Sequence, residues 1–281
     1  MSEKRNEVFG GRTARDMVGM SAADALKKEL NYEIPVESVP MPSAGSVYPE
    51  GNPLHNRETI EIKAMTAREE DILMSRALLK KGVVITELLK SCIVDKNVDA
   101  SEMLAGDRNA IMIAVRITGY GADYTVETNC PQCDSRETST FNLGQMPIKR
   151  LTIKPVEPGA NLFSFKLPVS GQDIQFKFLT GRDDKEISTT QDRLKKQGIY
   201  LDNSITSKLQ CAIQTISGNS DKNLIANFVR NMPARDSLAL RKFIENNEPG
   251  VEMKGWLECS ACGEQSEVPV PVGASFFWPA G

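Results

Sequence analysis

The feature that most constrains this chain is a pair of C-x-x-C motifs set far apart in its 281 residues. Two residues between the cysteines allow both thiolates of a motif to turn toward one ion, and zinc takes four such ligands tetrahedrally. Zinc ribbons usually have a much shorter spacing between their two motifs, so this chain must fold to bring them together. The sequence predicts one structural Zn²⁺ per chain, held by Cys130, Cys133, Cys259 and Cys262.

Two further cysteines, Cys92 and Cys211, stand alone on apolar helical segments, where we expect small buried side chains. The N-terminus lacks the apolar stretch of a signal peptide, so we expect a reducing compartment, in which paired cysteines favour metal binding over disulfides. A redox role for the motifs is one alternative, but redox motifs usually begin a helix, whereas these follow strand-like segments. A degenerate site without metal is another.

The chain also contains an internal repeat. The segment EIKAMTAREEDI has the form of FKFLTGRDDKEI, and the similarity continues in the same order through two helical segments to a C-x-x-C motif. In this alignment Thr66 corresponds to Thr180 and Cys92 to Cys211. Because a repeat constrains a fold more than any single element does, we predict an α+β fold. It is an internally duplicated helix bundle plus strands, whose two halves are joined by a zinc-ribbon-like four-cysteine site.

Local signals support this order of elements. Thr66 and Glu69 form a capping-box pattern at the start of a helix over 67–81, which ends at Gly82. The predicted segments are an extended N-terminal arm (1–55), a first repeat with its zinc knuckle (56–146), a strand-rich connector (147–174), a second repeat with its zinc knuckle (175–270) and an aromatic C-terminal tail (271–281).

The two ends of the chain differ from its middle. The N-terminal arm is rich in proline and has weak apolar periodicity, apart from a short helix expected over Met20–Leu30. The C-terminal tail gathers Phe276, Phe277 and Trp278. These aromatic side chains either fold back into the core or bind a pocket on a partner protein. In both cases we expect them to be buried, because an exposed aromatic tail promotes aggregation.

Several functional classes lack support. The single histidine, His55, lies in the arm, and no phosphate-binding or nucleophile motif is present. The carboxylate clusters at 69–71 and 183–184 fall in the first turns of predicted helices, where negative charge favours the helix dipole. We therefore predict that the chain is not an enzyme. The net charge of -3 and the lack of a long apolar run argue against nucleic acid and membrane partners.

Four sequence stretches carry a resemblance to a known family: LLKKGVVITELLKSCIVD, LAGDRNAIMIAVRITGYGADY, the CPQC knuckle and the closing FFWP. Together they resemble the T4-type baseplate hub proteins of contractile-tailed bacteriophages, most clearly over residues 56–143. The resemblance implies a structural or assembly role in the baseplate hub, with other hub and tail proteins as partners and several copies in one assembly. It implies a location in the virion tail baseplate, assembled in the host cytoplasm, and no catalytic residues.

Whether the protein remains in the finished virion or acts only during assembly stays open. The alternative function is a cytosolic zinc-ribbon module that binds nucleic acid. Such a module requires a basic stripe beside the knuckles. The flanking sequences ETNCPQCDSRE and LECSACGEQSE are mostly acidic or neutral, which argues against phosphate binding.

Overall fold

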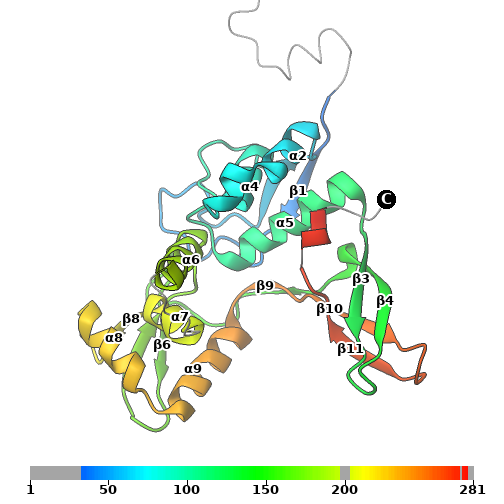
Figure 1. Cartoon of the computed structure of the whole chain (residues 1–281). Helices are drawn as coiled ribbons and strands as arrows, with labels where there is room; N and C mark the ends of the chain where they lie inside the picture. Colours follow the sequence, from blue (N-terminus) through cyan, green and yellow to red (C-terminus); the bar gives the residue numbers. More distant parts are fainter. Residues whose placement is uncertain (1–32, 197–202, 273, 278–281) are drawn as a thin grey trace, which may run out of the picture. The chain divides into compact units, whose positions relative to one another are not determined.

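The computed structural model describes residues 33–196, 203–272 and 274–277 (Figure 1). The short helix expected over Met20–Leu30 lies outside these residues. The described residues from Glu37 onward belong to one compact unit. We call residues 37–146 the first half and residues 147–272 the second half.

Among the described residues, the strands form four two-stranded sheets and one three-stranded sheet. The two-stranded sheets pair β1 (Val36–Pro40) with β2 (Thr59–Lys63), β3 (Asp123–Asn129) with β4 (Arg136–Asn142), β5 (Ile148–Lys149) with β9 (Gly250–Val251), and β10 (Lys254–Glu258) with β11 (Gln265–Pro269). The three-stranded sheet has the order β6 (Phe163–Lys166), β7 (Asp173–Phe176), β8 (Ile213–Ile216).

Groups of helices and groups of strands follow one another along the chain, so the fold mixes helix and strand as predicted (Figure 1). The first half holds α2 (Ala67–Met74), α3 (Arg76–Lys80), α4 (Val84–Cys92) and α5 (Ala105–Tyr120). The second half holds α6 (Gly181–Lys196), α7 (Ser204–Ala212), α8 (Lys222–Asn231) and α9 (Ala234–Asn247). Two short 3-10 helices are η1 (Leu143–Gln145) and η2 (Ala274–Phe277).

The helix predicted over 67–81 is interrupted. Ser75 has an extended backbone (φ -68°, ψ 103°), so it ends α2 and begins α3. The predicted C-terminal glycine, Gly82, has φ 64°, the left-handed conformation that favours glycine after a helix. The start of α2 is the capping box that the sequence predicted, with Thr66 as N-cap.

The N-terminal arm is shorter than predicted. Residues 37–55 contribute β1 and a turn-rich segment whose apolar side chains lie in the core: Val39, Met41, Val47, Tyr48 and Leu54. Prolines interrupt long elements but do not prevent a loop from packing, so the proline-rich composition misled the prediction of an extended arm over this part. The connector also has less strand than predicted. β5 ends at Lys149, and no residue of the following segment RLTIKPV is in a strand.

In the first half, Glu69 in the first turn of α2 holds three segments together. It accepts hydrogen bonds from Thr66 N (3.0 Å) and from Ser91 Oγ of α4. It also forms an ion pair with Lys63 of β2 (3.2 Å). Burial alone would raise the pKa of Glu69, but the hydrogen bonds outweigh it and lower the pKa to about 2.

The second half has the same arrangement around Asp183, in the first turn of α6. Asp183 accepts a hydrogen bond from Thr180 N (2.9 Å) and forms an ion pair with Lys177, directly after β7 (2.7 Å). The thiol of Cys211 on α7 lies 3.4 Å from the carboxylate. The acidic residues that the sequence placed in two first helical turns therefore do cap helices, and each also ties its helix to a strand and to the next helix.

These contacts shift the alignment of the two halves by one residue. Cys211 takes the position of Ser91, whereas the sequence comparison had placed it opposite Cys92. Cys92 is completely buried, and Cys211 is only partly buried.

Strand pairing recurs in the two halves. Ile62 in β2 pairs antiparallel with Ile93, directly after α4. Phe176 in β7 pairs antiparallel with Ile213, directly after α7. The second half extends this pair into β8 and then adds α8, which packs on α7 and has no counterpart in the first half.

A second buried acid recurs at the start of the last helix of each half. Asp107, at the third position of α5, accepts hydrogen bonds from the backbone and hydroxyl of Ser43 (2.9 and 2.6 Å) and from Tyr48 Oη (2.7 Å). Asp236, at the third position of α9, accepts from Val169 N and from the next backbone N–H (2.7 and 2.9 Å). Both acids have no exposed surface. Each acid ties the N-terminus of its helix to a loop. Asp107 binds the loop between β1 and β2, and Asp236 binds the loop between β6 and β7.

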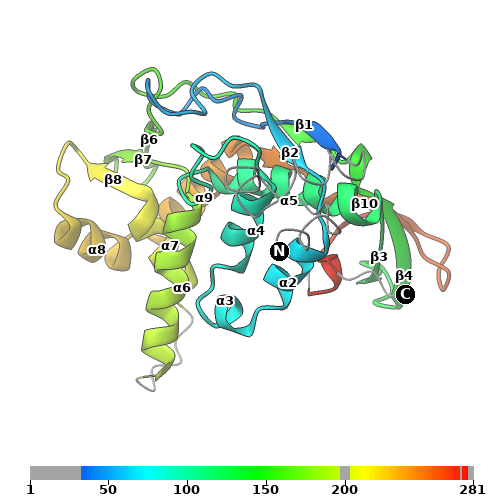
Figure 2. The ribbon, with the colours of Figure 1, turned by 90° about the horizontal axis from the view of Figure 1, so that it is seen from above.

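The two halves contact each other through backbone hydrogen bonds at the start of α5 and the start of α6. Ala105 N donates to Leu179 O (2.9 Å), and Gly181 N donates to Met103 O (3.1 Å). In the second half, α6 and α7 lie side by side (Figure 2).

Candidate metal centre

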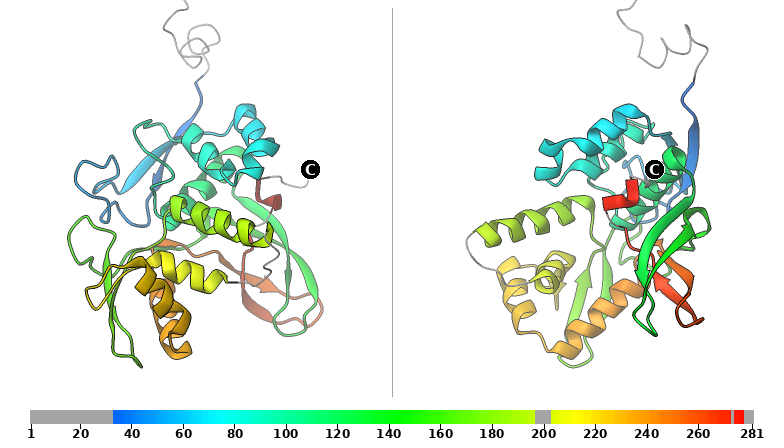
Figure 3. Two further views of the ribbon diagram at one scale, coloured as in Figure 1. Left: turned by 60° about the vertical axis from the view of Figure 1, so that its left-hand side comes forward. Right: turned by 45° about the vertical axis from the view of Figure 1, so that its right-hand side comes forward.

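Each C-x-x-C motif lies at the tip of an antiparallel β-hairpin. The first lies between β3 and β4 and the second between β10 and β11, and the two hairpins stand beside each other (Figures 1 and 3). The register runs from Asn129 opposite Arg136 in the first hairpin, and from Glu258 opposite Gln265 in the second. The first cysteine of each motif is buried, since Cys130 and Cys259 are only 2% and 1% exposed. Strand alternation places them on the inner side of their hairpins.

The two tips have the same hydrogen bonds. Cys130 N donates to Ser135 O, five residues on, and Asp134 N donates back to Cys130 O (both 2.9 Å). In the second tip, Cys259 N donates to the carbonyl oxygen five residues on (3.0 Å), and Gly263 N donates back to Cys259 O (2.8 Å). The residue after the second cysteine is left-handed in both tips, with φ 56° at Asp134 and 72° at Gly263. This tight turn is what directs both sulfurs of one motif to the same side.

The four sulfurs form one cluster. All lie within 4.8 Å of one another. The contacts between hairpins are Cys130 Sγ to Cys262 Sγ at 3.8 Å and Cys133 Sγ to Cys259 Sγ at 3.6 Å. Four sulfurs bound tetrahedrally at about 2.3 Å from zinc would be about 3.8 Å apart. The four cysteines could therefore hold a metal ion without a large movement of either hairpin.

The sulfurs are not equivalent in their protonation. The hydroxyl and backbone of Ser135 hydrogen-bond to Cys133 and lower its pKa to about 6. The backbone hydrogen bond with Glu264 lowers the pKa of Cys262, but the surrounding thiols and burial outweigh it and raise the pKa to about 12. The cluster therefore combines one thiol of lowered pKa with one of raised pKa.

Polar side chains connect the two tips beside the sulfurs. Ser135 Oγ lies 3.1 Å from Cys259 Sγ, across the hairpin boundary. Ser260 Oγ donates to both carboxylate oxygens of Glu137 on β4 (3.0 and 2.9 Å). Sequence reasoning missed this link, because Glu137 and Ser260 carry no motif and only the apposition of the hairpins reveals them.

The chemistry of the donor set is that of a closed structural site. Four thiolates complete a tetrahedral shell, so they leave no position on an ion for water or substrate. Neither motif begins a helix, the setting that most activates redox thiols.

Below the tips, the hairpins pack face to face. Gly255 of β10 lies so close to the ring of Phe141 on β4 that a Cβ at this position would collide with it. Leu257 and Val268 are buried on the same face. The hairpins therefore meet through an apolar contact as well as through the cysteine cluster.

The aromatic tail folds back onto the chain. Figure 3 shows η2, in red, next to α5. Arg116 Nε of α5 donates to Phe276 O (2.6 Å), and the ring of Phe276 packs edge-on against Tyr124 at 5.3 Å. Phe276 and Phe277 are 0% and 5% exposed. These contacts favour the interpretation that the tail completes the core, while Trp278 lies outside the described residues.

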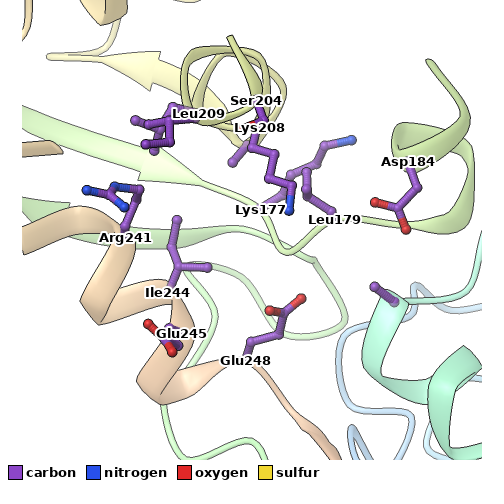
Figure 4. A pocket seen from close by; sticks show the side chains of 13 residues that line it. Lys177, Leu179, Asp184, Ser204, Lys208, Leu209, Arg241, Ile244, Glu245 and Glu248 are labelled. Carbon is purple, nitrogen blue, oxygen red and sulfur yellow. The ribbon is translucent and has the colours of Figure 1, made fainter. Parts of the chain in front are cut away.

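A cavity of about 430 Å³ lies in the second half, between α7, α9 and the start of α6. Figure 4 shows Asp184, Glu248 and Lys208 around its space, with Lys208 above and Glu248 below. Burial is the main cause that raises the pKa of both carboxyls. Apolar side chains, including Leu209 and Ile244, also line the cavity.

Comparison with known proteins adds a family match. The family model described as T4 bacteriophage base plate protein matches residues 41–278, which include both hairpins and most of each half. No curated protein and no solved structure matches the chain. In the described part of the chain, no helix is long and apolar enough to cross a membrane.

Proposed function

Because the chain belongs to the T4 bacteriophage base plate protein family, we propose that it is a structural or assembly protein of the baseplate hub in a contractile phage tail. The match over residues 41–278 is the observation that carries this proposal, since it spans the described fold from the end of β1 onward. Its partners are other hub and tail proteins, with several copies in one assembly. Its location is the virion tail, after assembly in the host cytoplasm.

The second part of the proposal is a zinc clamp. One Zn²⁺ per chain binds Cys130, Cys133, Cys259 and Cys262. The support is the sulfur geometry, with contacts of 3.6 and 3.8 Å across the hairpins. Each half supplies one hairpin, so the ion fixes how the two halves meet. Structural zinc can contribute about 10–16 kcal/mol in small zinc domains, which is ample to hold a two-hairpin contact.

The third part is the internal duplication. The recurring acid contacts, the matching strand pairs and the identical hydrogen bonds of the two knuckles support it. A duplicated chain offers two similar but unequal surfaces. For an assembly protein, this allows one chain to contact two different neighbours through related elements.

The nucleic-acid alternative has less support. The side chains beside the knuckles include Asp134, Glu137, Glu258 and Glu264, which repel phosphates. Arg136 stands among them but is ion-paired with a glutamate at 3.5 Å.

Metal analysis of the purified full-length protein tests the clamp. We expect one zinc per chain, with the four knuckle thiols unreactive until a chelator removes the ion. Cys211→Ser is the matched control, because Cys211 lies outside the cluster and its loss should leave the zinc content unchanged. Protein that contains no zinc and has reactive or disulfide-bonded knuckle cysteines would contradict the clamp.

Localisation tests the assembly role. An epitope-tagged chain should label the baseplate end of purified tails, or baseplate intermediates alone if the protein acts only during assembly. Absence of label from both finished tails and intermediates would refute a baseplate role, whatever the metal content.

A further inference from the structure

The outer face of the second hairpin carries an exposed tryptophan. Trp256 in β10 is 73% exposed, more than any other large apolar side chain in the described part of the chain. Gly255 and Leu257, on either side of it, face the first hairpin, so strand alternation holds Trp256 on the opposite face. The indole is thus fixed in an exposed position by the same packing that joins the hairpins.

Two carboxylates and one lysine share this face with the indole. Glu267 of β11 is directly opposite Trp256 in the strand register, and Glu258 is two residues along the same face. Such positions put side chains about 5 Å and about 7 Å away, respectively. Glu267 also pairs with Lys254 at 3.4 Å, whereas Glu258 has no ion pair within the described residues. The face therefore combines an aromatic plane with more negative than positive charge.

The first hairpin lacks this combination. The position that matches Trp256, three residues before the first cysteine, is Glu127 in β3. The other exposed residues of its outer face are polar, such as Thr125 and Thr140, which bond each other at 2.8 Å. The two hairpins share their fold and their knuckles, so the difference does not come from folding requirements.

We propose that the outer face of β10–β11, with Trp256 flanked by Glu258 and Glu267, is a docking surface for an arginine-bearing segment of another tail protein. A guanidinium stacks on an indole and at the same time donates to carboxylates beside it. A lysine ammonium is more strongly hydrated and cannot stack in this way. The carboxylates exclude phosphate groups, so nucleic acid and anionic lipid surfaces do not fit this face. The proposal rests on the baseplate role for the identity of the partner.

The chain offers a direct spectroscopic test. It has two tryptophans, so in a Trp278→Phe variant the fluorescence reports Trp256 alone. The probe is the capped peptide Gly-Arg-Gly-Arg-Gly, compared at low ionic strength with its citrulline counterpart, which has the same shape without charge, and with its lysine counterpart. We expect a saturable change in Trp256 emission with the arginine peptide, weaker binding of the lysine peptide and no binding of the citrulline peptide.

Variants then locate the binding. Glu258→Gln combined with Glu267→Gln should weaken arginine-peptide binding at least about threefold, and Trp256→Ala should weaken it about fivefold when followed by calorimetry. Glu127→Gln on the first hairpin is the matched control and should change nothing. All variants should keep their zinc content and melting temperature, since these side chains are exposed.

Several results would overturn the proposal: no saturable change with the arginine peptide, equal binding of the citrulline or lysine peptide, or equal effects of Glu127→Gln and the double variant. These outcomes leave the baseplate role untouched, because that role is tested separately by the labelling of tails.

Discussion

In the first half, Leu88 on α4 has no exposed surface, and Met65 and Met112 pack against the core. In the second half, α7 and α9 line a cavity of about 430 Å³. The recurring contacts of the acids place Lys208 at the position of Leu88. The comparison teaches that one framework can be closed as a core or left open, depending on a few side chains at matching positions.

The largest expected effect is on the four-cysteine cluster, to which each half contributes two sulfurs. Cys130→Ser and Cys259→Ser should each abolish zinc binding and cost at least about 5 kcal/mol of unfolding free energy, because three thiolates bind zinc far less tightly than four. Metal content and urea unfolding measure this. If one substitution removes the ion and the other leaves it in place, the two hairpins do not share a single site.

The matched pair Leu88 and Lys208 tests the difference between core and cavity. Leu88→Lys should cost about 4 kcal/mol, since it places a charge at a position with no exposed surface. Lys208→Leu, at the exposed cavity rim, should change stability by no more than about 1 kcal/mol. Urea denaturation of both variants gives the two values, and equal costs would refute the difference between core and cavity at these two positions.

The dependence of stability on pH should distinguish Glu69, the capping-box acid of α2, from an exposed acid on the same helix. The folded-state pKa of Glu69 is about 2, below its unfolded value of about 4.3. Its contribution of about 3 kcal/mol is therefore complete above the unfolded pKa and is lost as the pH falls from about 4.3 toward 2. Glu69→Gln should flatten the dependence of stability on pH in this window. Asp71→Asn, an exposed acid on the same helix, is the control and should leave the slope unchanged.

The contact between the hairpins gives a moderate effect. Gly255→Ala should cost about 1–3 kcal/mol, because the added methyl group collides with the ring of Phe141. Thr125→Ala, on the exposed face of the first hairpin, should have little effect. Thermal unfolding compares the two variants, and a neutral Gly255→Ala would show that the hairpins are not in tight contact.

The smallest effects should have opposite signs in the two knuckles. Asp134→Gly should stabilise by up to about 1 kcal/mol, because Asp134 has φ 56° and glycine adopts this conformation without strain. Gly263→Ala, at φ 72°, should destabilise by about 1 kcal/mol. Melting temperatures with zinc bound measure both, and equal signs would show that the two turns are not equivalent.

Much of the local structure could be predicted from the sequence. The strand-like segment expected before the first C-x-x-C motif is β3, Asp123–Asn129, and the capping box at Thr66 begins α2 as expected. Alternation, capping patterns and C-x-x-C spacing act over a few residues, so they are visible in sequence.

Other features depended on contacts that no short pattern contains. Ser75 divides a helix whose sequence is continuous in its periodicity, and α8 is a helix of the second half without a counterpart among the described helices of the first half. The proline-rich segment 37–55 joins the core because Asp107 binds Ser43 and Tyr48, more than fifty residues away. Trp256 could have been placed on an exposed face only by knowing which face of its hairpin meets Phe141.

By itself, the sequence determined the two knuckles and the ligand type they offer, because the turn that aims two thiolates is built from adjacent residues. The tertiary structure alone decided that the four sulfurs lie within 4.8 Å, that Leu88 is buried whereas Lys208 borders a cavity, and that Trp256 is exposed. These properties are differences in packing between segments far apart in the chain. Their free energies depend on the whole fold and not on any local run of residues.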